Sequence, residues 1–335
     1  MKLFRLLLVV TLCAMQMSCG QTERINGLSF VASRNAIDEN HVKPVVNVNA
    51  NYASVMPFGF IRDLSHPEIM FNTERQWFGE TRAGAKQYID QLRQKSIKIM
   101  LKPQIWVWRG EYTGFIEMKN EEDWKTLENS YSKFIMEYAE LAEETKAEIL
   151  CIGTELEKFI EKRPEYWNNL INQIKAVYKG KLTYAANWDE YKRTPFWGKL
   201  DFIGLDAYFP VSDSKTPTME ECREGWKAHK ETIKATALKY EKPILFTEYG
   251  YRSVDYTGKE PWRYDRSMNQ VNLEAQVNAT KALFEEFWKE EEWFAGGFIW
   301  KWFHNHTASG GEKNNQFTPQ NKPVEQVLKA YYKQE

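Results

Sequence analysis

Residues 149 to 155 read ILCIGTE, and residues 244 to 248 read ILFTE. Each stretch is a short apolar run that ends in Thr-Glu. Such runs are typical of strands that are buried on both faces of a parallel sheet. A glutamate at the end of a buried strand is informative, because an ionised carboxylate near a core needs a partner or a chemical task.

Apolar runs of this kind recur along the chain and alternate with amphipathic segments. The other runs that we expect to form strands are 28–32, 44–48, 97–101, 182–185, 202–205 and 297–300. The segments that we expect to form helices include 83–95, 124–146, the run that Pro164 opens, and 269–289. About eight strands alternating with helices favour an α/β protein built as a single-domain (β/α)8 barrel, the TIM barrel. An open doubly wound sheet is the alternative, but no Gly-x-Gly-x-x-Gly turn and no Walker loop supports it.

The N-terminus has the pattern of an export signal. A basic start and a short apolar run precede Ser18-Cys19-Gly20. We therefore expect residues 1–19 to be a signal peptide of the lipoprotein type, with Cys19 acylated as the only membrane anchor of a protein in the bacterial cell envelope, on its periplasmic side or at the cell surface. A plain signal peptide cleaved nearby is the alternative, and the protein would then be secreted. Residues 20–27 are expected to form a short tether and residues 28–335 the barrel domain.

The composition is neutral and rich in aromatic residues. The 335 residues include 45 Lys and Arg against 46 Asp and Glu, a net charge of −1, and 13 Trp against only 18 Gly. A hydrophobic content of 43% excludes wholesale disorder, and the neutral balance gives no electrostatic footprint for nucleic acid. Cys151 and Cys222 are interpreted as isolated thiols, and His304-Asn-His306 lacks a third ligand, so we expect no metal site.

The two Thr-Glu strand ends indicate paired carboxylates. In a barrel, the carboxyl ends of the strands meet at one mouth, which would bring Glu155 and Glu248 into one cleft. Two carboxylates in a cleft suit glycoside hydrolysis, in which one donates a proton to the leaving oxygen and the other attacks the anomeric carbon. The alternative is structural: Thr154 could cap the helix that follows, with Glu155 in its first turn.

Aromatic and polar residues also follow the expected strands. Flat aromatic rings can stack on the apolar faces of sugars, and we expect Trp106, Trp188 and Trp300 to do so. Trp108 and Trp302 stand two positions after the first and last of these, so each pair should share a face of its strand. We expect one ring of each pair to reach the cleft and the other to pack deeper or to lie in a loop. Polar side chains near strand ends could hydrogen-bond sugar hydroxyls, with helix capping as the alternative reading. These polar candidates are Asn51, Lys102, Asn187 and Asp206.

Several segments, taken together and in order, resemble glycoside hydrolase family 113. They are 101–106 (LKPQIW), 152–156 (IGTEL), 204–210 (GLDAYFP), 247–251 (TEYGY) and 317–323 (FTPQNKP). The similarity extends from about Phe30 to Leu328. The family belongs to clan A, has a (β/α)8 barrel, and contains retaining endo-β-1,4-mannanases.

The resemblance implies roles for individual residues. Glu155 would be the general acid/base and Glu248 the nucleophile, and Tyr208 would hydrogen-bond the nucleophile and keep it ionised. Thr154 precedes the acid/base, as is usual for this family, where the clan generally has Asn. Gln104 departs from the pattern, since close relatives are expected to carry His there, beside the point of cleavage.

We therefore expect a monomeric retaining glycoside hydrolase that cleaves β-1,4-mannan, glucomannan or manno-oligosaccharides without a cofactor. The same chemistry on a β-glucan, xylan or β-mannoside is one alternative. A non-catalytic glycan-binding lipoprotein is another. A Schiff-base aldolase would need a desolvated lysine on an inner strand, for which Lys102 and Lys301 are the strand-end candidates. A phosphate-binding barrel would need a helix after Gly310-Gly311.

Overall fold

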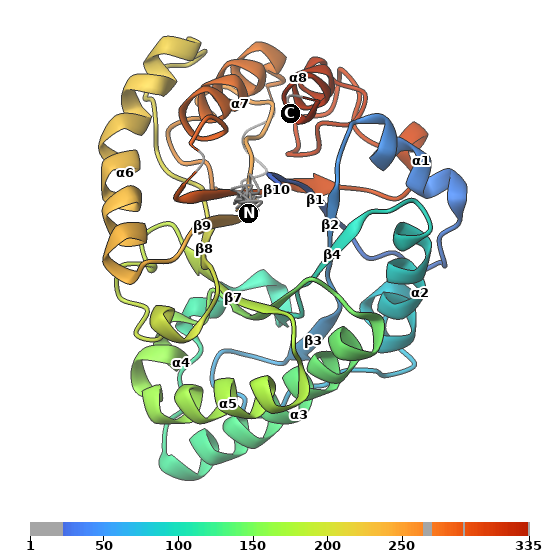
Figure 1. Ribbon diagram of the computed structural model, residues 1–335, viewed down its shortest axis with the longest axis vertical. Helices are drawn as coiled ribbons and strands as arrows, with labels where there is room; N and C mark the ends of the chain where they lie inside the picture. Colours follow the sequence, from blue (N-terminus) through green and yellow to red (C-terminus); the bar gives the residue numbers. More distant parts are fainter. Residues whose placement is uncertain (1–22, 264–269, 291, 334–335) are drawn as a thin grey trace, which may run out of the picture.

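Eight parallel strands close into a barrel in the computed structural model, which describes residues 23–263, 270–290 and 292–333. The strand order around the barrel is β1-β10-β9-β8-β7-β6-β4-β2, and the helices surround it (Figure 1). The barrel strands are β1 (Ile25–Phe30), β2 (Tyr52–Val55), β4 (Lys98–Leu101), β6 (Ile149–Thr154), β7 (Lys181–Asn187), β8 (Ile203–Asp206), β9 (Ile244–Tyr249) and β10 (Phe294–Trp302). This arrangement confirms the predicted (β/α)8 barrel.

The helices follow the strands along the chain, as the alternating pattern predicts. They are α1 (Glu39–Asn47), α2 (Arg82–Arg93), α3 (Glu121–Thr145), α4 (Glu157–Lys162), α5 (Pro164–Val177), α6 (Met219–Tyr240), α7 (Leu273–Phe287) and α8 (Pro323–Tyr332). Side chains of α3 such as Tyr131, Phe134 and Tyr138 are buried at helical spacing. The connection between β7 and β8 contains only the short 3-10 turn Trp197–Lys199.

Two further strands extend the barrel wall at its mouth. β3 (Phe58–Ile61) pairs with β5 (Gln104–Val107) in the same relative register as β2 with β4. Pro57 and Pro103 separate the two sheets, because proline lacks the N–H group that a continuous ladder would need. The wall above β2 and β4 is therefore taller than a plain barrel strand would make it.

Two expectations about the N-terminal part were wrong. Residues 44–48, expected as a strand, lie in and just after helix α1, where Val42 and Val45 form its buried face. Their three-residue spacing is a helical one, which a short apolar run does not distinguish from a strand. The barrel also begins earlier than expected, because Ile25 to Gly27, assigned to the tether, already pair with β10 and β2. Asn26 and Gly27 interrupt the apolar pattern there without interrupting the backbone pairing.

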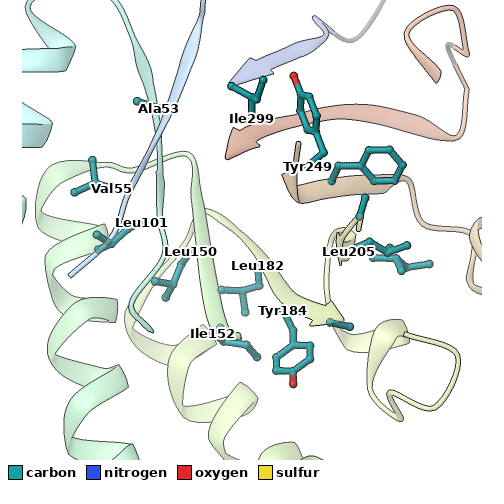
Figure 2. Packing of buried hydrophobic residues seen from close by; sticks show 14 of the residues in the cluster. Ala53, Val55, Leu101, Leu150, Ile152, Leu182, Tyr184, Leu205, Tyr249 and Ile299 are labelled. Carbon is teal, nitrogen blue, oxygen red and sulfur yellow. The ribbon is translucent and has the colours of Figure 1, made fainter. Parts of the chain in front are cut away.

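Side chains alternate between the inside and the outside of the barrel wall. An inner cluster fills the lower part of the barrel and consists of Ile25, Met100, Ile149, Cys151, Ala185, Phe202, Leu245 and Phe298. The neighbouring positions Leu150, Ile152 and Leu182 belong to the outer cluster that packs under the helices (Figure 2). Water is thus excluded both beneath the mouth and around it.

The expected signal peptide and the acylated Cys19 lie outside the described residues. Within residues 23–263, 270–290 and 292–333, no helix is long and apolar enough to span a bilayer. Cys151 and Cys222 are both buried and free.

Gly84 in helix α2 provides a test of the packing between that helix and the chain before it. A Cβ atom built on Gly84 would lie 1.8 Å from the carbonyl oxygen of Phe78. Helix propensity alone would make Gly84→Ala stabilising by about 1 kcal/mol, but the clash should reverse the sign and lower the free energy of unfolding by about 1–3 kcal/mol. Urea denaturation followed by circular dichroism measures this.

Gly198→Ala is the matched control, because a Cβ atom there would meet nothing within 4 Å. Its free energy of unfolding should stay within about 0.5 kcal/mol of the wild type. Equal stability of the two variants would contradict the tight approach of Phe78 to helix α2.

Candidate active site

Glu248, at the end of β9, is held by three hydrogen-bond donors. The Lys102 ammonium donates to Oε1 at 2.5 Å, and the Gln104 amide donates to the same oxygen at 3.2 Å. The Tyr208 hydroxyl donates to Oε2 at 2.8 Å. Each carboxylate oxygen therefore faces donors, which is the environment of an ionised acceptor. The contact expected between Tyr208 and Glu248 is present.

Lys102 is shared between two carboxylates. It is completely buried and lies 3.4 Å from Asp206 as well as 2.5 Å from Glu248. Burial lowers the pKa of Lys102, but the charges of Asp206 and Glu248 outweigh it, so the net pKa is raised and the ammonium stays charged. Burial, then the charge of Glu248, raises the pKa of Asp206 to about 7 against the opposing effect of Lys102.

Glu155 follows β6 in a left-handed backbone conformation with φ of 49°. Its N–H donates to the Ala185 carbonyl at 2.8 Å, and its carbonyl accepts from the Thr113 hydroxyl at 3.0 Å. Burial, followed by the charges of Asp206 and Glu248, raises the pKa of Glu155 well above its usual range. Glu155 thus retains its proton at a pH where an ordinary carboxyl group has lost it, as a general acid requires.

Trp106 lies on the same wall of the site as the residue that contacts Glu248. Gln104 and Trp106 are two apart in β5 and share a face, whereas Ile105 and Val107 are buried on the other face. Trp106 is 49% exposed and pairs across the ladder with Phe60 of β3. These two register neighbours, Trp106 and the partly exposed Phe60, make up an aromatic wall above β2 and β4.

Trp300 and Trp188 lie at other points of the rim. Trp300 is partly exposed, and the Lys301 ammonium sits 5.3 Å from its ring centre. Burial lowers the pKa of Lys301, and the charge of Glu248 opposes this. Trp188 is partly buried and stacks on Trp262 at 5.0 Å between ring centroids.

In each tryptophan pair one ring reaches the rim and the other is packed deeper or lies in a turn, as expected. Trp302 is completely buried, so only Trp300 of that pair reaches the rim. β5 ends at Val107, and Trp108 begins a 3-10 turn, so strand alternation does not continue to it.

Tyr112 is a site residue that sequence reasoning missed. Its hydroxyl accepts a hydrogen bond from the Asn187 amide at 2.9 Å. Burial, and next the charge of Glu155, raises the pKa of Tyr112, so the Tyr112–Asn187 pair lies beside Glu155. Asn187 is therefore where the sequence predicts it. No sequence signal distinguishes Tyr112 from the other tyrosines, because its loop position carries no periodicity.

Three of the residues expected to bind sugar are placed otherwise. Lys102 and Asp206 are 0% and 1% exposed, so they support Glu248 from beneath and do not present their polar atoms to the cleft. Asn51 lies at the opposite end of the barrel, because it precedes β2, and it accepts from the N–H of Asn26 at 2.9 Å. The error over Asn51 follows from taking residues 44–48 as the second strand.

The two histidines that follow β10, His304 and His306, contact other residues. His306 lies 2.6 Å from Glu325, and the His304 ring packs 5.2 Å from that of His41. Among the described residues, no group of three or more His, Cys, Asp or Glu could hold a metal ion.

Known proteins share the family and the fold of this chain. The family model described as Glycoside Hydrolase Family 113 matches residues 32–322. No curated protein sequence matches the chain. A solved complex of a GH113 β-1,4-mannanase superimposes with a TM-score of 0.80 at 23% identity, covering 93% of this chain and 100% of that one.

Other solved structures share the fold. The GH113 β-mannanase AaManA from Alicyclobacillus acidocaldarius, in complex with ManMIm, has a TM-score of 0.80 at 23% identity and covers 92% of this chain and 97% of its own. A β-glucuronidase from Faecalibacterium prausnitzii is more distant, with a TM-score of 0.60 at 16% identity, and covers 92% of this chain and 48% of its own. Because the family model spans most of the sequence, the chain belongs to glycoside hydrolase family 113 and is a glycoside hydrolase.

Proposed function

We propose that the protein is a retaining β-1,4-mannanase that acts on mannan, glucomannan or manno-oligosaccharides. The observation that carries this proposal is that one site holds two carboxyl groups with different hydrogen-bond partners and different electrostatic surroundings. Glu248 receives donors on both oxygens, whereas the pKa of Glu155 is raised by burial, Asp206 and Glu248. The choice of mannan rests on the family and on solved structures described as β-1,4-mannanases.

In the first step, Glu248 attacks the anomeric carbon and Glu155 donates its proton to the departing glycosidic oxygen. In the second step, Glu155 removes a proton from a water molecule, which attacks the same carbon and releases Glu248. Tyr208 and Gln104 orient the two oxygens of Glu248 for this attack through the hydrogen bonds described above.

The charges of the site explain how Glu155 changes role between the two steps. While Glu248 is ionised, its charge contributes to the raised pKa of Glu155. When Glu248 becomes an ester in the glycosyl-enzyme, that charge disappears and the pKa of Glu155 falls, so Glu155 becomes able to accept a proton. Lys102 keeps Asp206 as its partner throughout.

The rim suits an uncharged polysaccharide. The chain has a net charge of −1, and the exposed or partly exposed rings of Trp106, Trp188 and Trp300 follow different strands around the mouth. Binding would then depend on stacking and on hydroxyl contacts, with little contribution from a long-range field.

Incubation with mannan, glucomannan, β-glucan and xylan tests the proposal. We expect a ladder of manno-oligosaccharides from the first two, and proton NMR at early times should show the β-anomer as the initial product. Glu155→Gln should lower kcat/KM on mannan by about 10²–10⁴-fold, and Glu248→Gln should abolish turnover.

Circular dichroism of both variants controls for folding. Initial release of the α-anomer would overturn the retaining mechanism. A ladder from β-glucan or xylan alone would change the substrate, mannose alone would indicate an exo-acting enzyme, and no product from any glycan would favour the glycan-binding lipoprotein.

Removing the buried cation tests its role beneath Glu248. Lys102→Met leaves Glu248 and Asp206 buried without a counter-charge, so the free energy of unfolding should fall by about 3–5 kcal/mol. The loss should be smaller at pH 5 than at pH 8, because the pKa of Asp206 is about 7 and this carboxyl group is neutral at the lower pH. Urea denaturation at both pH values measures the effect, and kcat on mannan should fall with it.

Lys230→Met is the control for this substitution. Lys230 pairs with Glu286 and Glu290 between α6 and the end of α7, away from the barrel mouth. Lys230→Met should lower the free energy of unfolding by less than Lys102→Met does, and it should leave kcat unchanged. Wild-type kcat in Lys102→Met would show that the ammonium is dispensable for catalysis.

Trp106→Ala tests the aromatic wall. Because Trp106 is 49% exposed, its removal should not unfold the protein. We expect kcat/KM on mannohexaose to fall about tenfold, equivalent to about 1.4 kcal/mol, through a higher KM. Trp108→Ala is the control, since Trp108 is 64% exposed but lies beyond the shared face of β5. An equal effect of the two substitutions would remove Trp106 from its assigned place.

A further inference from the structure

Glu190 is a buried carboxyl group that the proposed mechanism does not use. It lies in the loop after β7 and is 0% exposed. The Tyr184 hydroxyl donates to its Oε1 at 2.7 Å, and the Asn187 backbone N–H donates to its Oε2 at 3.0 Å. Each oxygen therefore accepts from a different residue of β7.

The Tyr184 hydroxyl connects Glu190 to the backbone of Leu156, the residue after Glu155. Its side chain lies on the outer face of the barrel wall, where Figure 2 shows it near Ile152. Its hydroxyl accepts a hydrogen bond from the backbone N–H of Leu156 at 2.6 Å. A tyrosine hydroxyl has one hydrogen. Because Glu190 takes that hydrogen, a lone pair of the oxygen remains directed at Leu156.

The turn that this bond holds is unfavourable in itself. Glu155 has φ of 49°, a region that residues other than glycine seldom occupy. Such a conformation persists only where the surroundings determine it. Three contacts do so here: the N–H of Glu155 to Ala185, the Thr113 hydroxyl to the carbonyl of Glu155, and the N–H of Leu156 to Tyr184.

We propose that Glu190 is a positioning residue for the acid/base: through Tyr184 it holds the left-handed turn at Glu155, and at alkaline pH, where Glu190 is ionised, its negative charge favours the protonated form of Glu155. The inference rests on the proposed role of Glu155 as acid/base. Through its second oxygen, Glu190 also fixes the backbone of Asn187, whose amide reaches Tyr112 beside Glu155. One carboxyl group thus links both flanks of the acid/base.

The surrounding charges agree with this role. The pKa of Glu155 is raised first by burial, then by Asp206, Glu248 and Glu190, with Lys102 opposing. The pKa of Glu190 is raised to about 8, chiefly by burial, with Asp206 and Asp189 adding and the bonds from Tyr184 and Asn187 opposing. Burial, followed by the charges of Glu155 and Glu190, raises the pKa of Tyr112. The negative charge of Glu190 thus develops around pH 8.

Two substitutions separate the geometric effect from the electrostatic one. Glu190→Gln keeps an acceptor for Tyr184, gives up the acceptor for the Asn187 N–H and removes the charge, so the alkaline limb of kcat/KM should move to lower pH while the value at the optimum falls less than about tenfold. Tyr184→Phe keeps the charge and removes the acceptor for Leu156. It should lower kcat by about 10–100-fold, with KM nearly unchanged and without moving the alkaline limb downward.

Glu286→Gln is the matched control, because Glu286 on helix α7 is also a buried carboxyl group. It accepts a hydrogen bond from Arg223 of helix α6 at 2.8 Å. This substitution should lower stability and leave the pH profile as in the wild type. The proposal is overturned if Glu190→Gln leaves the alkaline limb in place and Tyr184→Phe leaves kcat unchanged.

A readout without turnover separates this inference from the proposed function. In protein labelled with ¹³C at glutamate carboxyl carbons, the Glu155 signal, assigned by its loss in Glu155→Gln, should titrate at lower pH in Glu190→Gln than in the wild type. If no glycan is cleaved, the proposed function fails while this titration still tests the charge of Glu190. An identical Glu155 titration in both proteins would overturn the electrostatic part.

Discussion

One buried ammonium group underlies the whole arrangement at the barrel mouth. Lys102 extends from the end of β4 and contacts Asp206 on β8 and Glu248 on β9, without any exposure to solvent. Two carboxylates at such a short separation could not both remain ionised in a buried site without a cation between them. The position of Lys102 therefore determines where these two carboxyl groups can lie side by side at the barrel mouth.

The barrel makes that interaction possible. Met100 and Leu245 belong to the apolar layer that fills the barrel beneath the charged groups, and Lys102 and Thr247 follow them by two residues on the same strands. Strand alternation therefore places a polar layer directly above an apolar one. The layer below the site is apolar and buried, so the charges act on one another at short range with little screening.

Much of this could be predicted from the sequence, because the signals were local. About eight short apolar runs alternating with amphipathic segments were enough to predict the barrel, and the two runs that end in Thr-Glu were enough to place Glu155 and Glu248 at its mouth. Local patterns failed where they are ambiguous: Val42 and Val45 fit a helix, yet residues 44–48 read equally well as a strand, and Asn51 was misplaced as a consequence. Lys102 and Asp206 were placed at the correct strand ends. Their orientation was wrong, since a sequence does not reveal whether a strand-end side chain turns into the cleft or beneath it.

The remaining differences arise from contacts between segments that are distant in sequence. Glu155 and Glu248 end their strands with the same two letters, yet Glu248 receives donors on both oxygens, and among the described residues none donates to the Glu155 carboxyl group. Tyr112 and Tyr184 come from a loop and from another strand, and they meet Asn187 and Leu156 only in the folded protein. Two carboxyl groups of equal sequence context thus acquire different surroundings, because one is bonded by charged and neutral donors while the other is surrounded by negative charge. Only the closed barrel brings about that difference, since it brings the ends of β6, β8 and β9 together around a shared, buried interior.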